Sequence, residues 1–367
     1  GSITANADIL SDTGDITIAA ASDIDFTANV NVTTAGSGSI DLNTVNGSVT
    51  LATDSDQTAE TGDIRISSGA DITLGGVITT SGSVSLIAAG VITDGDNDDS
   101  VDVVATGLRV ASAGFGTSSN AIETTIDAFA ASATTGGIYL DDTSALVVGT
   151  VTVAIDRVNT DASVTSIVDS SLIGAVATVS DIEISSELDL TLELVQTTTD
   201  AVLTSNTGSI LDGGDLTTDV IVGGTATLSA VTGLGRTGSG DLDLEVGILN
   251  AVNTGVGSAY LNLIGNTEIA GLELQGAGSL FLAQRTGDLT VTGVIEITDG
   301  RALLTTRGAL TVNADVAATD YLRTVSSTLD VNGATLSSEN GDVEIRTSSD
   351  ADFDATSAVN ALNGLIT

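Results

Sequence analysis

Residues 107–150 read GLRVASAGFGTSSNAIETTIDAFAASATTGGIYLDDTSALVVGT, and the chain repeats this stretch at residues 219–266 as DVIVGGTATLSAVTGLGRTGSGDLDLEVGILNAVNTGVGSAYLNLIGN. Gly114-Phe115-Gly116 aligns with Gly233-Leu234-Gly235, and Tyr139 aligns with Tyr260. The offset between the copies rises only from 118 to 121 residues, as single-residue insertions in turns would produce. Such repetition predicts a chain of stacked structural units.

A shorter repeat runs through the rest of the chain. Apolar-x-apolar triplets such as Ile16/Ile18, Ile24/Phe26 and Val30/Val32 recur, often after Gly-Asp or Gly-Ser. The period of two predicts short strands with one buried face, and the Gly-containing steps predict turns. Three triplets pass in about 20 to 24 residues before the pattern restarts. We therefore expect an all-β fold, a β-solenoid with three short strands in each rung of roughly 20 residues.

The strands are expected to pair in parallel with the equivalent strands of the next rung. Asn-Gly, the strongest signal for an antiparallel hairpin, never stands between two long strands. The chain also has no proline, which fits strands that all donate N–H groups to a neighbour. We expect one continuous solenoid over residues 1–367, an excerpt of a longer repetitive protein, with super-repeat copies at about 90–150 and 209–266. The triplets, Val151/Val153 among them, are expected to continue as rungs between the copies.

Composition restricts the function classes. Aromatic residues make up 2% of the chain, so the core is narrow and filled by small branched side chains. Hydrophobic residues at 41% argue against disorder despite a net charge of −40. Nine Arg and Lys against 49 Asp and Glu exclude nucleic acid as an expected partner, because phosphate binding requires clustered cations. No apolar run approaches the length of a transmembrane segment, and the absence of cysteine leaves the redox compartment open.

The first copy carries a family resemblance. Gly114-Phe-Gly-Thr-Ser-Ser-Asn-Ala-Ile-Glu-Thr124, followed by Gly136-Gly-Ile-Tyr-Leu140, resembles a segment of giant repetitive bacterial surface proteins, the haemagglutinin-like adhesins of the filamentous-haemagglutinin type. Phe115 and Ala121 stand where that pattern has Ile and Pro, and the second copy matches more loosely. The resemblance implies a right-handed parallel β-helix in a secreted or surface-displayed shaft.

Catalytic chemistry is not expected. The chain lacks His, Cys and Lys, the usual bases and nucleophiles, so only carboxylates, Arg, Tyr and hydroxyl groups remain. Asp141-Asp142 and the Asp212/Asp215 pair are the carboxylates that a glycan-cleaving β-helix enzyme could use. We interpret them as turn residues, and we predict no enzyme and no catalytic residue. Phe115 is expected to fill the core at a corner.

The most acidic loop, Asp94-Gly-Asp-Asn-Asp-Asp99, offers calcium candidates in Asp94, Asp96, Asp98 and Asp99. The spacing is not that of an EF-hand, and a polar loop that bulges from a rung is the alternative interpretation. We expect the protein to require no cofactor, and Ca²⁺ is the ion that this loop could bind.

The leading functional hypothesis is the non-catalytic shaft of a large extracellular adhesin or surface filament, which acts through length, stiffness and a repetitive acidic surface. Its expected partners are further repeats of the same giant chain or self-association, with cell-surface glycans or neighbouring cells as further options. The expected location is extracellular or on the bacterial cell surface. Two alternatives remain: a carbohydrate-active β-helix enzyme, a polysaccharide lyase or hydrolase, and a calcium-linked tandem β-sandwich adhesin, which the repeat length would also fit.

Overall fold

The computed structural model describes residues 1–96, 99–214 and 217–367. The described residues form strands, turns and bends without a helix, and the strands stack in parallel as a β-solenoid of about 16 turns with rungs of roughly 22 residues. The predicted fold class is therefore confirmed. The chain divides into two compact units, Gly1–Ser186 and Glu187–Thr367.

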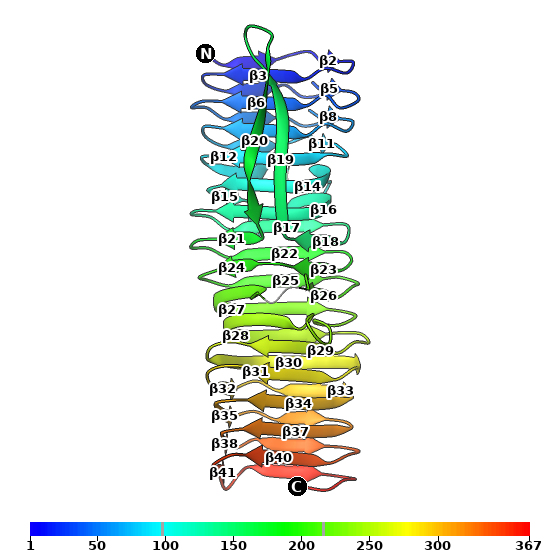
Figure 1. The fold of residues 1–367 in the computed structure, drawn as a ribbon, viewed down its shortest axis with the longest axis vertical. Coiled ribbons are helices and arrows are strands. Elements are labelled where there is room, and N and C mark those ends of the chain that lie inside the picture. The colour runs from blue at the N-terminus through cyan, green and yellow to red at the C-terminus, as the bar shows by residue number, and fades with distance from the viewer. Residues whose placement is uncertain (97–98, 215–216) are drawn as a thin grey trace. The chain divides into compact units, whose positions relative to one another are not determined.

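Unit 1 is built from three ladders of parallel strands (Figure 1). The first ladder stacks β1 (Ile3–Ala5), β4 (Ile24–Phe26), β7 (Val49–Leu51), β10 (Ile72–Leu74), β13 (Val91–Asp94), β15 (Gly114–Phe115), β17 (Ile138–Asp142) and β22 (Ile182–Ser186). The second stacks β2 (Ile9–Ser11), β5 (Val32–Thr34), β8 (Gln57–Ala59) and β11 (Ile78–Thr79), and the third β3 (Ile16–Ala20), β6 (Ile40–Thr44), β9 (Ile64–Ser68) and β12 (Ser83–Ala88). The long strands β14 (Val103–Ser112) and β16 (Ile122–Ala133) extend the second and third ladders together, and β18 (Leu146–Val148) and β21 (Ala175–Ala177) pair with β16.

Unit 2 repeats this plan. Its first ladder contains β23 (Leu190–Leu192), β26 (Ile210–Asp212), β29 (Ala259–Leu263), β31 (Leu280–Gln284), β34 (Arg301–Thr306), β37 (Tyr321–Ser326) and β40 (Val343–Thr347). The second ladder contains β24 (Val195–Thr197), β32 (Leu289–Val291), β35 (Ala309–Val312), β38 (Thr328–Val331) and β41 (Ala351–Phe353). The third contains β25 (Ala201–Ser205), β33 (Ile295–Asp299), β36 (Val316–Ala318), β39 (Thr335–Ser338) and β42 (Ala358–Ala361). The long strands β27 (Val220–Ala230), β28 (Leu242–Asn253) and β30 (Thr267–Ala277) pass through both.

The core consists of columns in which apolar side chains from successive rungs lie one above another. One column of unit 1 contains Ile16, Ile40, Ile64, Val84, Leu108 and Phe129, all of which are buried. Strand alternation points every second residue into such a column, which explains the period of two in the sequence. Since branched aliphatic side chains fill the narrow interior, few aromatic residues are needed.

The two super-repeat copies adopt the same local structure. Phe115 and Leu234 are both completely buried, as predicted for Phe115. Each is followed by a glycine with positive φ, +65° at Gly116 and +67° at Gly235. A Cβ atom at these glycines would lie 2.7 Å from the Tyr139 carbonyl oxygen and 2.5 Å from that of Tyr260, respectively. The Gly-apolar-Gly element is therefore a corner that requires glycine for both conformation and space.

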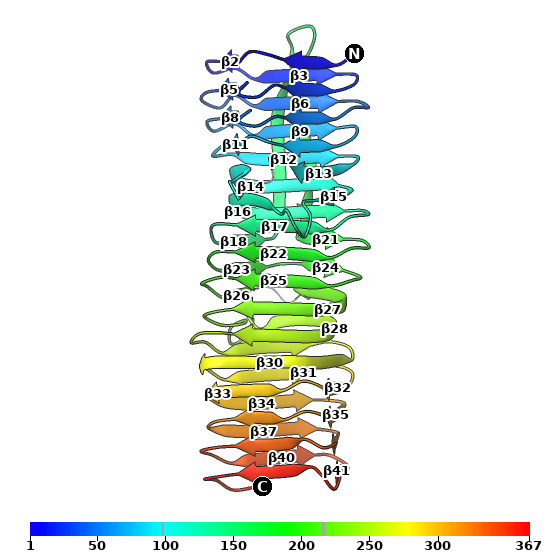
Figure 2. The same cartoon turned by 180° about the vertical axis from the view of Figure 1, so that it is seen from behind.

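Residues 150–173 depart from the predicted rung pattern. They form an antiparallel hairpin of β19 (Thr150–Val158) and β20 (Val164–Ile173), inserted between β18 and β21. The hairpin lies across β3, β6 and β12, and its tip extends beyond β3 (Figure 1); in the opposite view it lies behind the stacked strands (Figure 2). The prediction that Val151 and Val153 form a rung strand was wrong. Together with Ile155 they are buried against Ala130 of β16.

Ion pairs hold the hairpin to the outer face of the third ladder. Asp41 of β6 is completely buried and accepts hydrogen bonds from Arg65 of β9 (Nη1 to Oδ1, 3.2 Å) and Arg157 of the hairpin (Nε to Oδ2, 2.5 Å). Arg65 Nε also donates to both carboxylate oxygens of Asp169 in β20, at 3.2 Å each. Arg109 of β14 donates to the Ser170 carbonyl oxygen at 2.7 Å. Five charged side chains and one backbone carbonyl group thus join two elements that are far apart in sequence.

Candidate metal centre

Most turn carboxylates have a structural role that begins with their place in the rung. An aspartate directly before a strand accepts a hydrogen bond from the backbone N–H of the equivalent residue one rung later. Asp15, for example, accepts from Ser39, and Asp288 from Ala309, both at 2.8 Å. The same contact is made by Asp8, Asp23, Asp56, Asp63, Asp71, Asp102, Asp189, Asp200, Asp219, Asp315 and Asp342. The Gly-Asp and similar steps are therefore caps as well as turns, and charge-assisted bonds of this kind are stronger than neutral ones.

One group of acids is arranged differently. Single carboxylate oxygens of Asp94, Asp96 and Asp102 all lie within 4.8 Å of one another. Asp94 ends β13, Asp96 follows in the turn, and Asp102 directly precedes β14. Stacking adds Glu123, the second residue of β16, whose backbone N–H donates to Asp102 Oδ2 at 3.2 Å. The cluster thus combines a loop and two rungs.

Burial and mutual repulsion shift the ionisation of this cluster. Burial, reinforced by the negative charge of Asp94, raises the pKa of Asp102 to about 8. Burial also raises the pKa of Glu123 to about 7, and the charges of Asp94 and Asp141 add to this shift. Both shifts have the sign expected when carboxylates are withdrawn from water beside like charges.

The backbone of the turn is placed by Gly95, whose N–H donates to the Leu74 carbonyl oxygen. A Cβ atom at this position would lie 2.6 Å from Thr73 Cγ2 and 2.8 Å from Leu74 O. Only glycine therefore fits at this position. The tight turn that it permits brings Asp94 and Asp96 together, and the Asp96 N–H donates to Asp94 Oδ1 at 3.1 Å.

The four calcium candidates from the sequence are separated by the structure. Asp94 and Asp96 belong to the cluster, whereas Asp98 lies outside the described residues. Within the described part of the chain, Asp99 is exposed and is not a member of this group. Sequence reasoning missed Asp102 and Glu123, because their proximity to Asp94 depends on which residues stack one rung apart.

The carboxylates considered for catalysis are engaged in local structure. Asp142 is buried, and its Oδ2 accepts from Thr124 Oγ1 at 2.8 Å and from the Ile126 N–H at 2.9 Å. Its Oδ1 accepts from the Ser144 N–H and Oγ at 2.8 and 2.6 Å. Asp212 Oδ1 accepts from the Gly214 N–H at 2.7 Å, and Asp215 lies outside the described residues. Asp142 therefore stabilises its turn.

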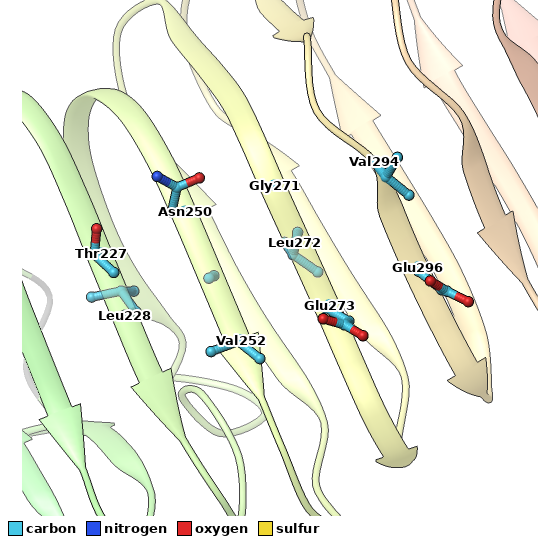
Figure 3. Close-up of a pocket in the computed structure, with 10 residues that line it drawn as sticks. Thr227, Leu228, Asn250, Val252, Gly271, Leu272, Glu273, Val294 and Glu296 are labelled. Carbon is cyan, nitrogen blue, oxygen red and sulfur yellow. The ribbon is translucent and has the colours of Figure 1, made fainter.

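A shallow groove lies on the outer face of unit 2 over Gly271 (Figure 3). Gly271 leaves a gap in the outward column between Asn250 and Val294 because it has no side chain. Glu273 and Glu296 stand in register beside the gap, on β30 and β33. The residues that line the groove include no aromatic side chain on which a sugar could stack.

Comparisons with known proteins assign no family. No protein-family model, no curated protein and no solved structure matches the chain. The described part of the chain also offers no helical segment of the length and apolarity that crossing a membrane requires.

Proposed function

We propose that this chain is part of the non-catalytic structural shaft of a large extracellular adhesin or surface filament. The observation that carries the proposal is the rung-on-rung pairing within each unit, in which almost every strand finds its partner one turn away. Such a stack transmits force through backbone hydrogen bonds and can be lengthened by adding rungs. The acidic caps leave an anionic surface that discourages lateral aggregation while they satisfy backbone donors.

The proposed location, on a bacterial surface or outside the cell, rests on the resemblance of residues 90–150 to haemagglutinin-like adhesins. Further repeats of the same chain are the natural partners, since parallel strands at the end of a stack can pair with another rung. Glycans or neighbouring cells are proposed as the more distant partners of such an adhesin.

Electron microscopy and diffraction of the purified chain provide the test. We expect straight particles and an axial spacing of about 4.8 Å, the distance between paired strands. Beads separated by flexible links would contradict the shaft. The tandem β-sandwich alternative does not fit the fold, because the rung strands pair in parallel whereas β-sandwich sheets are antiparallel.

A carbohydrate-active enzyme is the second candidate, favoured by the groove that holds Glu273 and Glu296. In-register residues on adjacent strands are about 4.8 Å apart, near the separation of two carboxylates in retaining glycosidases. Incubation with acidic and neutral polysaccharides would decide between the two functions. Release of reducing or unsaturated sugar that disappears in a Glu273→Gln variant would contradict a purely structural role.

A further inference from the structure

Asp94 occupies a position that the fold otherwise gives to a core residue. In the first ladder of unit 1, successive inward positions are filled by Phe26, Leu51, Leu74 and then Asp94, which is paired in register with Leu74. The side chain of Asp94 is only 8% exposed. Its Oδ2 atom is buried, and no described residue donates a hydrogen bond to it. A buried carboxylate oxygen without a partner costs free energy unless a ligand satisfies it.

The surroundings of Asp94 add negative charge. The charged groups that act on Asp102 are Asp94, Asp96 and Glu123, and the Oε2 atom of Glu123 is also buried without a donor among the described residues. Three carboxylates within 4.8 Å repel one another strongly where burial limits solvent screening. A bound cation would remove the repulsion and satisfy the orphaned oxygens at once.

The second super-repeat copy provides an internal comparison. Asp212 ends β26 as Asp94 ends β13, and Asp219 accepts from the Asp243 N–H at 2.8 Å as Asp102 accepts from Glu123. There the chain supplies its own cation: Arg285 pairs with Asp241 at 3.4 Å, and its charge opposes the rise in the pKa of Asp243. The acidic pattern occurs in both copies, but at the first copy the described charged neighbours of Asp102 are all acids.

We propose that Asp94, Asp96 and Asp102 bind one Ca²⁺ ion at the first super-repeat copy, with Glu123 beside them. Ca²⁺ prefers oxygen ligands and accepts irregular coordination of six to eight oxygens, so water and backbone carbonyls can complete the shell around three carboxylates. Mg²⁺ requires near-ideal octahedral geometry and fits such a loop less well. The ion would join the turn after β13 to the rungs that begin at β14 and β16.

Isothermal titration of the chelator-treated full chain with CaCl₂, at an ionic strength that screens the acidic surface, tests the proposal. We expect one saturable Ca²⁺ site per chain that is weaker by about tenfold or more in Asp94→Asn and in Asp96→Asn. MgCl₂ should bind more weakly than CaCl₂. Asp212→Asn, the equivalent change in the second copy, should leave the Ca²⁺ isotherm unchanged.

A second variant keeps the test decisive if Asp94→Asn folds poorly. Asp94→Leu continues the Phe26, Leu51 and Leu74 column, so it should lose Ca²⁺ binding while it melts at the same or a higher temperature in chelator. Wild-type protein should gain melting temperature when Ca²⁺ is added, and Asp94→Leu should not. Absence of a saturable site in the wild type, or an unchanged isotherm in Asp94→Leu, would overturn the proposal.

Discussion

Replacing Asp41 by asparagine should release the β19–β20 hairpin from unit 1 while the stacked rungs persist. Asp41 is completely buried and receives both Arg65 and Arg157, so Asp41→Asn leaves two guanidinium groups facing a neutral amide. Loss of one partner from a buried ion pair costs about 3 to 5 kcal/mol. The lower figure applies, because Arg65 keeps Asp169 and the Arg157 side chain is 28% exposed to water. About 3 kcal/mol corresponds to roughly a hundredfold rise in the undocked population.

Hydrogen exchange can measure that population at individual amides. The N–H groups of Ala154, Asp156 and Val158 donate to side chains of the ladder beneath, Asp63 Oδ2, Ser39 Oγ and Thr17 Oγ1, so undocking exposes them to solvent. In Asp41→Asn we expect their exchange to accelerate about a hundredfold, whereas amides within the rungs change little.

Asp330 provides the matched control, since it is an exposed outward aspartate on β38 of unit 2. Asp330→Asn should leave hairpin exchange unchanged. Equal acceleration of hairpin and rung amides in Asp41→Asn would show that the ion pairs support the whole stack rather than the hairpin, and unchanged exchange would show that they contribute nothing to docking.

Three further predictions concern the caps, the core and the acidic cluster. Asp288→Ala should lower the free energy of unfolding by about 1 to 2 kcal/mol in denaturant titrations, since it removes the acceptor of the Ala309 N–H, whereas Asp288→Asn should retain most of that stability. Phe115→Ala should cost about 3 to 5 kcal/mol because it leaves a cavity beside Phe129, whose ring centroid is 5.8 Å away; Phe115→Leu, the residue found in the second copy, should cost clearly less. In chelator, stability should be highest below pH 4 to 5 and fall as the pH rises through about 7 to 8, because the folded-state pKa values of Asp102 and Glu123 lie above their ordinary values of 3.8 and 4.5. Melting temperatures at pH 5 and pH 8.5 measure this loss of stability, which should be smaller in Asp102→Asn than in the wild type. An equal loss in the two proteins would contradict the raised pKa of Asp102.

The solenoid could be predicted because each rung repeats the same short sequence pattern. Alternation points every second residue inward, an aspartate directly before the strand marks many turns, and the restart after about 20 residues sets the rung. Phe115 could be placed in the core from its position between two glycines, since its counterpart Leu234 is equally apolar. These features are local, and local chemistry is sufficient to specify them.

The hairpin could not be predicted from the same alternation. Val151, Val153 and Ile155 follow the period of two that parallel rung strands also follow, because side chains alternate in both kinds of sheet. The register and direction of pairing are decided by where the chain leaves the stack, at Gly149 and at Gly174, which has a φ of +66°. Length does not separate the two kinds of strand either, since β19 has 9 residues and the rung strands β14 and β16 have 10 and 12.

A carboxylate can stand directly before a strand, at an outward position of the strand or at an inward position. Its place determines its role, and only the first of these places can be recognised without the structure. An aspartate directly before a strand, such as Asp15, meets the N–H of the next rung and becomes a cap. One at an outward position, such as Asp41, remains solvated unless another element covers it, and then it requires a cation from that element. One at an inward position, such as Asp94, is withdrawn from water by the stack itself. The first place is visible as an aspartate directly before a strand pattern, as in the step Gly14-Asp15, whereas the other two depend on register and on coverage by distant segments. A buried carboxylate requires a compensating positive charge or hydrogen-bond donor. Asp41 receives it from arginine side chains, whereas the Oδ2 atom of Asp94 has no donor among the described residues and is therefore where we propose a bound cation.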